Sequence, residues 1–152
     1  MPRVIQINMQ NPLYQKERML RNRILLNPIG IPDFGWEMND SISWHFIAVE
    51  KGELIGCVLL TPLDHEKNSA QLMQMAVETN WQGKGVGKLL VDALISFAEA
   101  QGFKCIEIHS RSNVIGFYTR LGFETVGEEF VEVGIKHRYM RKYLSQGGSS
   151  TI

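Results

Sequence analysis

The sequence predicts one domain of the α/β class, in a mixed α+β arrangement, and three observations support this prediction. A length of 152 residues with 44% hydrophobic composition fits one ordinary hydrophobic core. Runs of β-branched and apolar residues alternate with stretches of helical periodicity. A strand, a long amphipathic helix and another strand follow one another at the centre. We expect residues 1–145 to form the domain and residues 146–152 to be a disordered tail.

The first half of the chain is predicted to contain one helix and three strands. Apolar residues at helical spacing predict a helix over Tyr14–Leu26, ahead of the breaker-rich stretch 27–35. Lys51-Gly52 separates two apolar, β-branched runs and therefore predicts a tight hairpin turn. The expected strands are 43–50, 53–61 and 69–77.

The second half is predicted to begin with a long helix from Val86. Its apolar residues form one stripe, and Gln101-Gly102 ends it. The elements expected after it are a strand at 104–109, a short helix at 113–121, and closing strands at 123–133 and 137–143.

Composition restricts the classes of partner. Sixteen basic and sixteen acidic residues cancel, which argues against nucleic acid or an acidic membrane surface as the partner. Cys57 and Cys105 have no spacing typical of zinc or of a disulfide framework, so they are interpreted as thiols in a reducing compartment. No apolar stretch reaches the roughly 18 residues that a membrane helix needs. A cytoplasmic protein without a membrane partner is expected.

Three glycines mark the most informative segment. Gly83, Gly85 and Gly87 lie between a predicted strand and the start of the long helix. Free backbone amides and the positive end of the helix dipole favour a diphosphate there, and glycine lets it approach closely. The segment is not a Walker A motif, because Leu89 occupies the Ser/Thr position. It is not a dinucleotide-binding fingerprint either, because the required third glycine is missing. A ligand-free glycine turn is the structural alternative.

The segment Gln82–Gly87 resembles the Q/R-x-x-G-x-G/A signature of the GNAT acetyltransferases, which it matches fully. The preceding Met75–Val77 looks like the strand of that family whose backbone pairs with the pantetheine arm of acetyl-CoA. Thr79 stands where the family often has proline. The resemblance implies acetyl-CoA as co-substrate, without a metal, and a binding set of Met75, Ala76, Val77, Gln82, Gly83, Lys84, Gly85, Val86, Gly87, Lys88 and Asn113.

The stretch Asn113–Phe123 resembles the N-x-x-A-x-x-F-Y-x-x-x-G-F element of the same superfamily, with Gly116 at the usual alanine. Attack of an amine on a thioester expels a thiolate, which a nearby tyrosine hydroxyl can protonate. A free thiol titrates near ~8.5 and a tyrosine near ~10, so the transfer is only slightly uphill. We expect Tyr118 to be the general acid. The alternative is that it simply packs beside Phe117.

Two further stretches extend the resemblance over nearly the whole chain. Residues 18–30 look like the L-R-x-x-V-L-x-x-P-x-G opening of a bacterial GNAT branch related to ElaA-like proteins. Residues 130–140 resemble its F-x-E-x-G-I-P-H-x-x-M segment, with Lys136 in place of proline. The resemblance implies the GNAT fold, a mixed central sheet of about six to seven strands flanked by about four helices.

The general base that accepts the proton of the attacking amine could be His137, Glu132 or water. Imidazole changes charge near neutral pH, so His137 suits the task directly, whereas a carboxylate such as Glu132 needs a bridging water or a raised pKa. His45, His65 and His109 lack metal-site spacing, and no metal is expected.

The acceptor is expected to be a small-molecule amine, because no long charged segment would steer a peptide. A protein or peptide amine, a non-catalytic acyl-CoA-binding module and a pure interaction domain are the alternatives. Exposed strand edges at the C-terminus favour pairing of two copies, so a homodimer is considered and the oligomeric state is left open.

Overall fold

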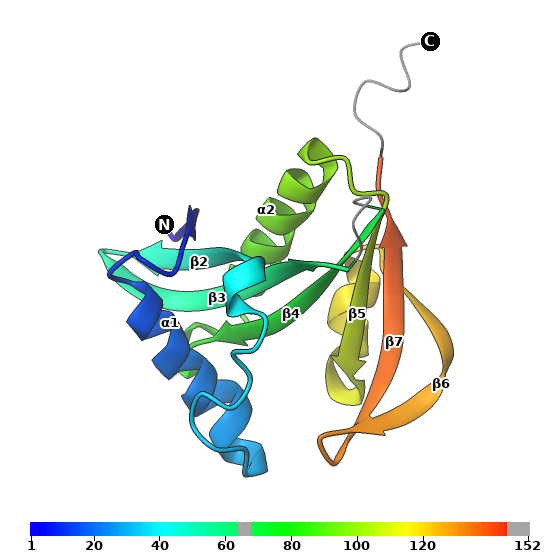
Figure 1. The fold of residues 1–152 in the computed structure, drawn as a ribbon, viewed down its shortest axis with the longest axis horizontal. Helices are drawn as coiled ribbons and strands as arrows, with labels where there is room; N and C mark the ends of the chain where they lie inside the picture. Colours follow the sequence, from blue (N-terminus) through cyan, green and yellow to red (C-terminus); the bar gives the residue numbers. More distant parts are fainter. Residues whose placement is uncertain (64–67, 146–152) are drawn as a thin grey trace. The chain divides into compact units, whose positions relative to one another are not determined.

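A computed structural model describes residues 1–63 and 68–145 of the chain, and all structural statements below concern them. The tail predicted to be disordered, 146–152, and His65 lie outside these residues. Seven strands form one mixed sheet in the order β1-β2-β3-β4-β5-β7-β6, with three α-helices (Figure 1). The predicted fold class is therefore confirmed, with three α-helices and several short 3₁₀ segments where about four helices were expected.

The element bounds agree closely with the predicted ones. The α-helices are α1 (Tyr14–Arg21), α2 (Val86–Ala100) and α3 (Ile115–Arg120). The strands are β1 (Arg3–Ile7), β2 (Trp44–Glu50), β3 (Glu53–Pro62), β4 (Ser69–Val77), β5 (Cys105–Arg111), β6 (Glu124–Glu132) and β7 (Ile135–Tyr143).

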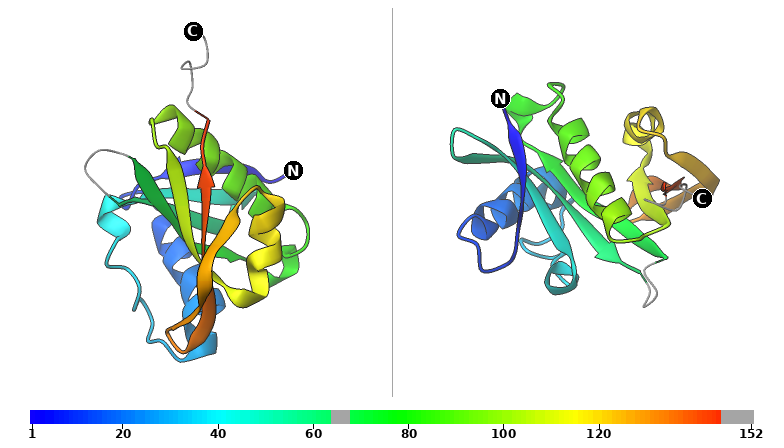
Figure 2. Two further views of the ribbon diagram at one scale, coloured as in Figure 1. Left: turned by 90° about the vertical axis from the view of Figure 1, so that its right-hand side faces the viewer. Right: turned by 90° about the horizontal axis from the view of Figure 1, so that it is seen from above.

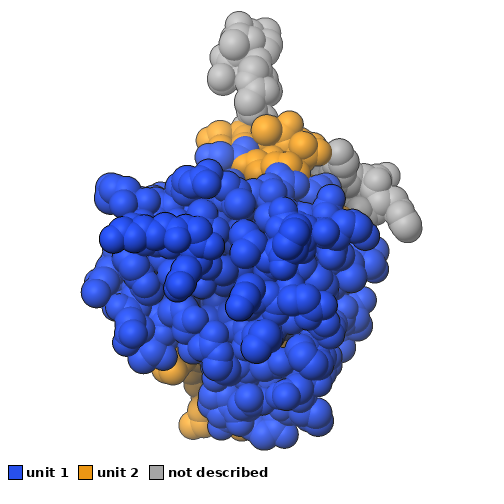
Figure 3. Space-filling view, turned by 90° about the vertical axis from the view of Figure 1, so that its left-hand side faces the viewer, with its two compact units in different colours: residues 1–61, 73–96 blue, residues 62–72, 97–152 orange. Residues whose placement is uncertain are grey.

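The chain divides into two compact units, coloured separately in Figure 3. Unit 1 contains residues 1–61 and 73–96, and unit 2 contains residues 62–72 and those from 97 onward. Strand β4 begins in unit 2 and ends in unit 1. The glycine segment therefore belongs to unit 1, whereas Tyr118, Glu132 and His137 belong to unit 2.

Unit 1 is built on an antiparallel meander. β1 pairs with β2, and β2 pairs with β3 through a hairpin. Lys51 and Gly52 at its turn both have positive φ, 51° and 80°, as a two-residue primed turn requires. The predicted tight turn is confirmed. β1 was not predicted, because its five residues carry too short a pattern to stand out before pairing with β2.

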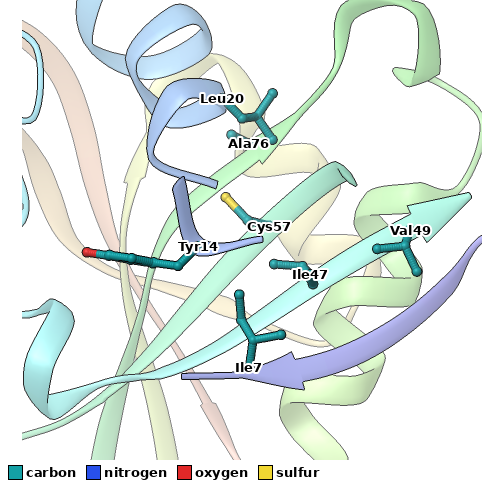
Figure 4. Packing of buried hydrophobic residues seen from close by; sticks show 7 residues of the cluster. All are labelled: Ile7, Tyr14, Leu20, Ile47, Val49, Cys57 and Ala76. Carbon is teal, nitrogen blue, oxygen red and sulfur yellow. The ribbon is translucent and has the colours of Figure 1, made fainter. Parts of the chain in front are cut away.

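The two helices of unit 1 cover opposite faces of its strands (Figure 2). Tyr14 and Leu20 of α1 pack into a buried cluster with residues of β1 to β4, drawn in Figure 4: Ile7, Ile47, Val49, Cys57 and Ala76. On the other face, a Cβ on Gly56 would lie 3.1 Å from Leu90 and 3.2 Å from Val86, so glycine allows α2 to approach β3 closely.

The predicted helix over Tyr14–Leu26 changes character halfway. It is α-helical to Arg21 and continues as a π-helical turn, Asn22–Leu26. Asn27, the residue before Pro28, keeps helical angles, and the chain continues as a short 3₁₀ segment, Asn27–Ile29, which ends at Gly30 with φ 78°. The sequence therefore located the helix, but not its widened last turn.

A buried network of four charged side chains links α1 to the segment before β2. Arg21 contacts Glu17 at 2.9 Å and binds both carboxylate oxygens of Asp40, at 2.9 and 3.0 Å. Tyr14 donates its hydroxyl to Asp40, and Glu17 also accepts from His45 Nδ1 at 2.8 Å. All five residues are buried. Such a network is retained only when its members are mutually paired, because an unpaired buried charge is costly.

His45 carries a positive charge in this network. Its Nδ1 faces the Glu17 carboxylate, and its Nε2 lies 2.8 Å from the backbone oxygen of Asp40. Both partners only accept hydrogen bonds, so both ring nitrogens must donate. Burial lowers the pKa of His45, but the hydrogen bond and charge of Glu17, with Asp40, raise it above its usual value. Two positive and two negative charges then balance.

This balance predicts a pH-dependent stability. Because folding raises the pKa of His45, the stabilisation is complete below its unfolded pKa, near ~6.5, and is lost as the pH rises through the folded pKa. The free energy of unfolding, measured by urea denaturation, is expected to fall as pH rises above about 6.5, by about 1.4 kcal/mol for each unit of upward shift. His45→Gln should flatten this slope. An equal slope in both proteins would contradict the assignment of charge.

Unit 2 is built around β5. β5 pairs in parallel with Ser69–Leu72 of β4, through Cys105–Ile108, and antiparallel with β7 along its whole length. β7 pairs in turn with β6, with an irregularity between Val126 and Phe130. β5 extends to Arg111, two residues past the predicted end at His109, because β7 continues to pair with it there.

Candidate functional site

The glycine segment forms an exposed turn that leads directly into α2. Thr79–Trp81 makes one 3₁₀ turn after β4, residues 82–85 form the turn itself, and α2 begins at Val86. Val86 is buried against the unit 1 core, whereas Gln82 to Gly85 are exposed. The sequence prediction of a strand, glycine turn and helix in immediate succession is confirmed.

The first turn of α2 presents backbone donors. The first intrahelical bond runs from Leu89 N to Gly85 O at 3.1 Å, so the amides of Val86, Gly87 and Lys88 precede it and lack intrahelical acceptors. These amides and the helix dipole favour an anion at this end. The arrangement suits a diphosphate held by backbone donors.

Two of the glycines have backbone angles that other residues adopt only with strain. Gly83 has φ 77° and Gly85 has φ 87°, and a Cβ built on either meets nothing within 4 Å. Glycine is therefore required by conformation rather than by packing. Any side chain here would project into the open space above the loop, where a ligand would lie.

The end of β4 is tied to the loop. Gln82 donates from Nε2 to the backbone oxygen of Val77 at 3.0 Å, so two of the predicted site residues are brought together. Met75 and Val77 are half-buried and Ala76 is buried in the unit 1 core. Gln74, just before them, has φ 57°, which interrupts the regular strand.

Gln74, with its positive φ, makes one hydrogen bond through its backbone and one through its side chain. Its backbone oxygen accepts from Cys57 Sγ at 3.4 Å, and its side-chain oxygen lies 3.3 Å from Arg21 Nε. Arg21 therefore connects the buried charge network to the irregular point in β4. The Arg21 guanidinium is buried and engaged in structural contacts, which include the backbone oxygen of Trp36 at 2.8 Å.

Tyr118 lies on α3 between two aromatic rings. Phe117 and Phe123 contact it edge to face, at centroid distances of 4.9 and 5.8 Å. The side chain is 5% exposed, and burial raises the pKa of its hydroxyl. The hydroxyl therefore stays protonated at neutral pH and is a weaker acid than an exposed tyrosine, so transfer of its proton to a thiolate is more uphill. The packing beside Phe117 that the sequence offered as the alternative is present, and the proton-donor role of Tyr118 stays a prediction.

The two candidate proton acceptors have different surroundings. His137 is buried, stacks on Phe130 and bonds through Nδ1 to the backbone oxygen of Ile135 at 2.8 Å. Glu132 instead pairs with His109, with 2.9 Å between Oε1 and Nδ1. Sequence reasoning considered His109 only as a metal ligand and missed this pair, because the partners lie 23 residues apart and meet only through strand pairing.

Three further residues predicted to bind the cofactor, Lys84, Lys88 and Asn113, are exposed. Asn113 is exposed in the 3₁₀ turn before α3. Lys84 lies over the ring of Trp81, and Lys88 pairs with Asp92 at 2.7 Å. No cluster of three or more potential metal ligands is found within the described ranges. Among these residues no helix is long and apolar enough to cross a membrane.

Comparisons with known proteins identify similar sequences and folds. The sequence model of the acetyltransferase (GNAT) domain matches residues 33–144. A Bacillus subtilis (strain 168) protein, named as a proposed acetyltransferase, is 30% identical over 98 residues, which are 64% of this chain and 65% of that protein. The chain thus spans about two thirds of this curated relative, and less than half of some others.

Two solved structures share the fold. Escherichia coli ElaA has a TM-score of 0.80 at 18% identity, over 93% of this chain and 99% of that one. A GNAT family acetyltransferase from Elizabethkingia anophelis, solved with acetyl-CoA bound, has a TM-score of 0.74 at 18% identity, over 94% of this chain and 98% of that one.

Proposed function

This chain belongs to the GNAT acetyltransferase family, and we propose that it is an acetyl-CoA-dependent acyltransferase that acetylates the primary amine of a small molecule. The observation that supports a cofactor site in this chain is the exposed glycine turn, with the free amides of Val86 to Lys88 at the start of α2. We propose that residues 1–145 act as one catalytic domain, since the family match takes in both units.

In this proposal the diphosphate of acetyl-CoA binds the loop. The backbone of Gly83 to Lys88 would hold the phosphates, and the half-buried backbone of Met75 and Val77 would hold the pantetheine arm. Gln82 would act mainly by fixing the loop, because its side chain is bonded to Val77. Asn113, exposed before α3, is proposed to contact the same arm.

The acetyl group is proposed to pass directly to the amine in a ternary complex. The amine attacks the thioester carbonyl, and Tyr118 protonates the departing thiolate. The match of residues 113–123 to the tyrosine element of the family supports this role, although burial raises the pKa of the hydroxyl and makes it a weaker acid. Glu132 and His137 stay as candidate acceptors for the amine proton, with water as the alternative.

A small acceptor is preferred over a peptide because charge is balanced over the chain. Two free cysteines support a cytoplasmic location, and a homodimer remains a proposal based on the strand edges of unit 2. A protein or peptide amine is the second candidate acceptor.

The test is thiol release from acetyl-CoA across a panel of amines. The panel contains a diamine, an amino acid ester, an aminoglycoside and a short peptide with a free N-terminus. Release that depends on a small amine and exceeds release with the peptide is the expected result. Release that depends only on the peptide would favour the protein acceptor, and acetyl-CoA binding with no release would favour the non-catalytic module.

A further inference from the structure

The end of α1 and the π-helical turn after it contact β4 on both sides of the segment Met75–Val77. Arg21, the last residue of α1, donates from Nε to the side-chain oxygen of Gln74 at 3.3 Å. Arg23, in the π-helical turn, binds both carboxylate oxygens of Glu78, at 2.8 and 3.0 Å. Gln74 comes directly before the segment and Glu78 directly after it. Two arginines of unit 1 therefore fasten the segment at both ends.

The backbone of Gln74 depends on contacts from its surroundings. Its φ of 57° lies in the left-handed region, which a side chain disfavours because Cβ approaches the next carbonyl oxygen. Such angles persist only where neighbouring groups hold them. Cys57 Sγ holds the backbone oxygen at 3.4 Å, and Arg21 holds the side chain. Without the Arg21 contact, one of these restraints is lost.

The donor that Gln74 accepts from is fixed in position. The two terminal nitrogens of Arg21 bind Glu17, Asp40 and the backbone oxygen of Trp36, at 2.8 to 3.0 Å. The side chain is 2% exposed. The guanidinium cannot follow a strand that relaxes, so it acts as a fixed point for Gln74.

The middle of the segment packs against α1 and β3. Leu20 and Ala76 belong to one buried cluster (Figure 4). The backbone oxygen of Ala76 lies 3.3 Å from the position that a Cβ on Gly56 would take, and the amide of Glu78 donates to the backbone oxygen of Ile55 at 2.9 Å. Contacts from α1 and β3 thus determine where this part of β4 lies within unit 1.

The second fastening lies next to the glycine turn. The side chains of Arg23 and Glu78 are 53% and 29% exposed. The hydrogen bond and charge of Arg23 hold the pKa of Glu78 below its usual range, so the pair stays charged at neutral pH. Val77, the residue before Glu78, accepts from Gln82 Nε2 at 3.0 Å. The same end of β4 is therefore bonded both to the π-helical turn and to the glycine turn.

We infer that Arg21 and Arg23 position the backbone of Met75–Val77 for the pantetheine arm of acetyl-CoA. This inference rests on the proposed function, in which that backbone binds the arm and the glycine turn binds the diphosphate. Neither arginine contacts the cofactor: Arg21 acts through Gln74, and Arg23 acts through Glu78. A strand that is already held at its binding angles loses less freedom on binding, so the affinity for the arm is higher.

The test exchanges the exposed pair and measures the dissociation constant of acetyl-CoA by calorimetric titration. In Arg23→Glu and in Glu78→Arg, two like charges face each other, and we expect the affinity to fall about 5-fold in each. This factor corresponds to about 1 kcal/mol, the upper end for an exposed ion pair. The chain with both substitutions restores an ion pair and should return to within a factor of two of the unmodified chain.

The sign of the two changes separates positioning from simple electrostatics. Acetyl-CoA is an anion, so charge alone would weaken binding in Arg23→Glu and strengthen it in Glu78→Arg. Positioning predicts weaker binding in both. Opposite signs in the two variants, or no recovery in the exchanged chain, would overturn the inference.

Gln74→Leu tests the other end of the segment. Leucine removes the oxygen that Arg21 Nε binds, and we expect the dissociation constant of acetyl-CoA to rise about 10-fold. Phosphoadenosine diphosphate, which is coenzyme A without its pantetheine arm, should bind this variant and the unmodified chain within a factor of two, as followed by the amide NMR shifts of Gly83 and Gly85. Equal losses for both ligands would mean general disruption of unit 1 and would overturn the inference.

Arg18→Glu is the matched control. Arg18 lies on the same helix and also binds both oxygens of a glutamate, Glu37, at 2.7 and 3.0 Å, but Glu37 lies outside β4. Its affinity for acetyl-CoA should stay within a factor of two of the unmodified value. If the unmodified chain binds acetyl-CoA and every variant matches it, only this inference fails; if the unmodified chain does not bind acetyl-CoA, the proposed function fails.

Discussion

Tyr118→Phe is expected to lower kcat about 100-fold and to leave the dissociation constant of acetyl-CoA within a factor of two. The variant removes only a hydroxyl, and phenylalanine keeps the edge-to-face contacts with Phe117 and Phe123. The loss falls on kcat because the hydroxyl acts on a thiolate that forms only during reaction. Steady-state kinetics with a responsive amine, combined with calorimetric titration of acetyl-CoA, measure both quantities.

Tyr143→Phe is the control for this variant. Tyr143 is 64% exposed and contacts Arg141 through its ring, so losing its hydroxyl should change neither quantity. A Tyr118→Phe rate that stays within a factor of two of the unmodified rate across the pH range would remove this tyrosine from the mechanism.

Gly85→Asp is expected to raise the dissociation constant of acetyl-CoA about 100-fold. Gly85 has φ 87°, and a side chain here enters the open space above the amides of α2. Two like charges about 4 Å apart near a protein surface repel by about 4 kcal/mol, and rotation of the aspartate away from the phosphates would reduce this cost. Calorimetric titration of acetyl-CoA measures the change.

Gly52→Asp controls for backbone strain and added charge. Gly52 has φ 80°, and a Cβ on it also meets open space, but it lies in the β2–β3 turn. Its affinity for acetyl-CoA should be unchanged. Equal affinity in Gly85→Asp and the unmodified chain would place the cofactor elsewhere.

The sequence predicted the glycine turn and α2 well because their signals are local. A strand, three glycines and an apolar stripe follow one another within about thirty residues, and neither the turn nor the helix depends on distant partners for its pattern. The hairpin at Lys51-Gly52 was predicted for the same reason, since a dipeptide with glycine between two apolar, β-branched runs is a local signal of a tight turn.

The features that the sequence missed depend on contacts between distant residues. β1 has five residues and is defined by pairing with β2, whose partner residues lie 38 to 46 positions away. Arg21 and Asp40 meet across 19 residues, and His45 and Glu17 across 28, so nothing local marks them as a network. His109 and Glu132 meet because β5 and β6 both flank β7. Isolated charged residues in a sequence do not reveal such partners.

Titration of acetyl-CoA into the purified chain by calorimetry tests the central claim most directly. The account predicts saturable binding of one acetyl-CoA per chain, without added metal. A chain that is folded, as judged by its circular dichroism, and yet gives no saturable heat with acetyl-CoA would contradict it.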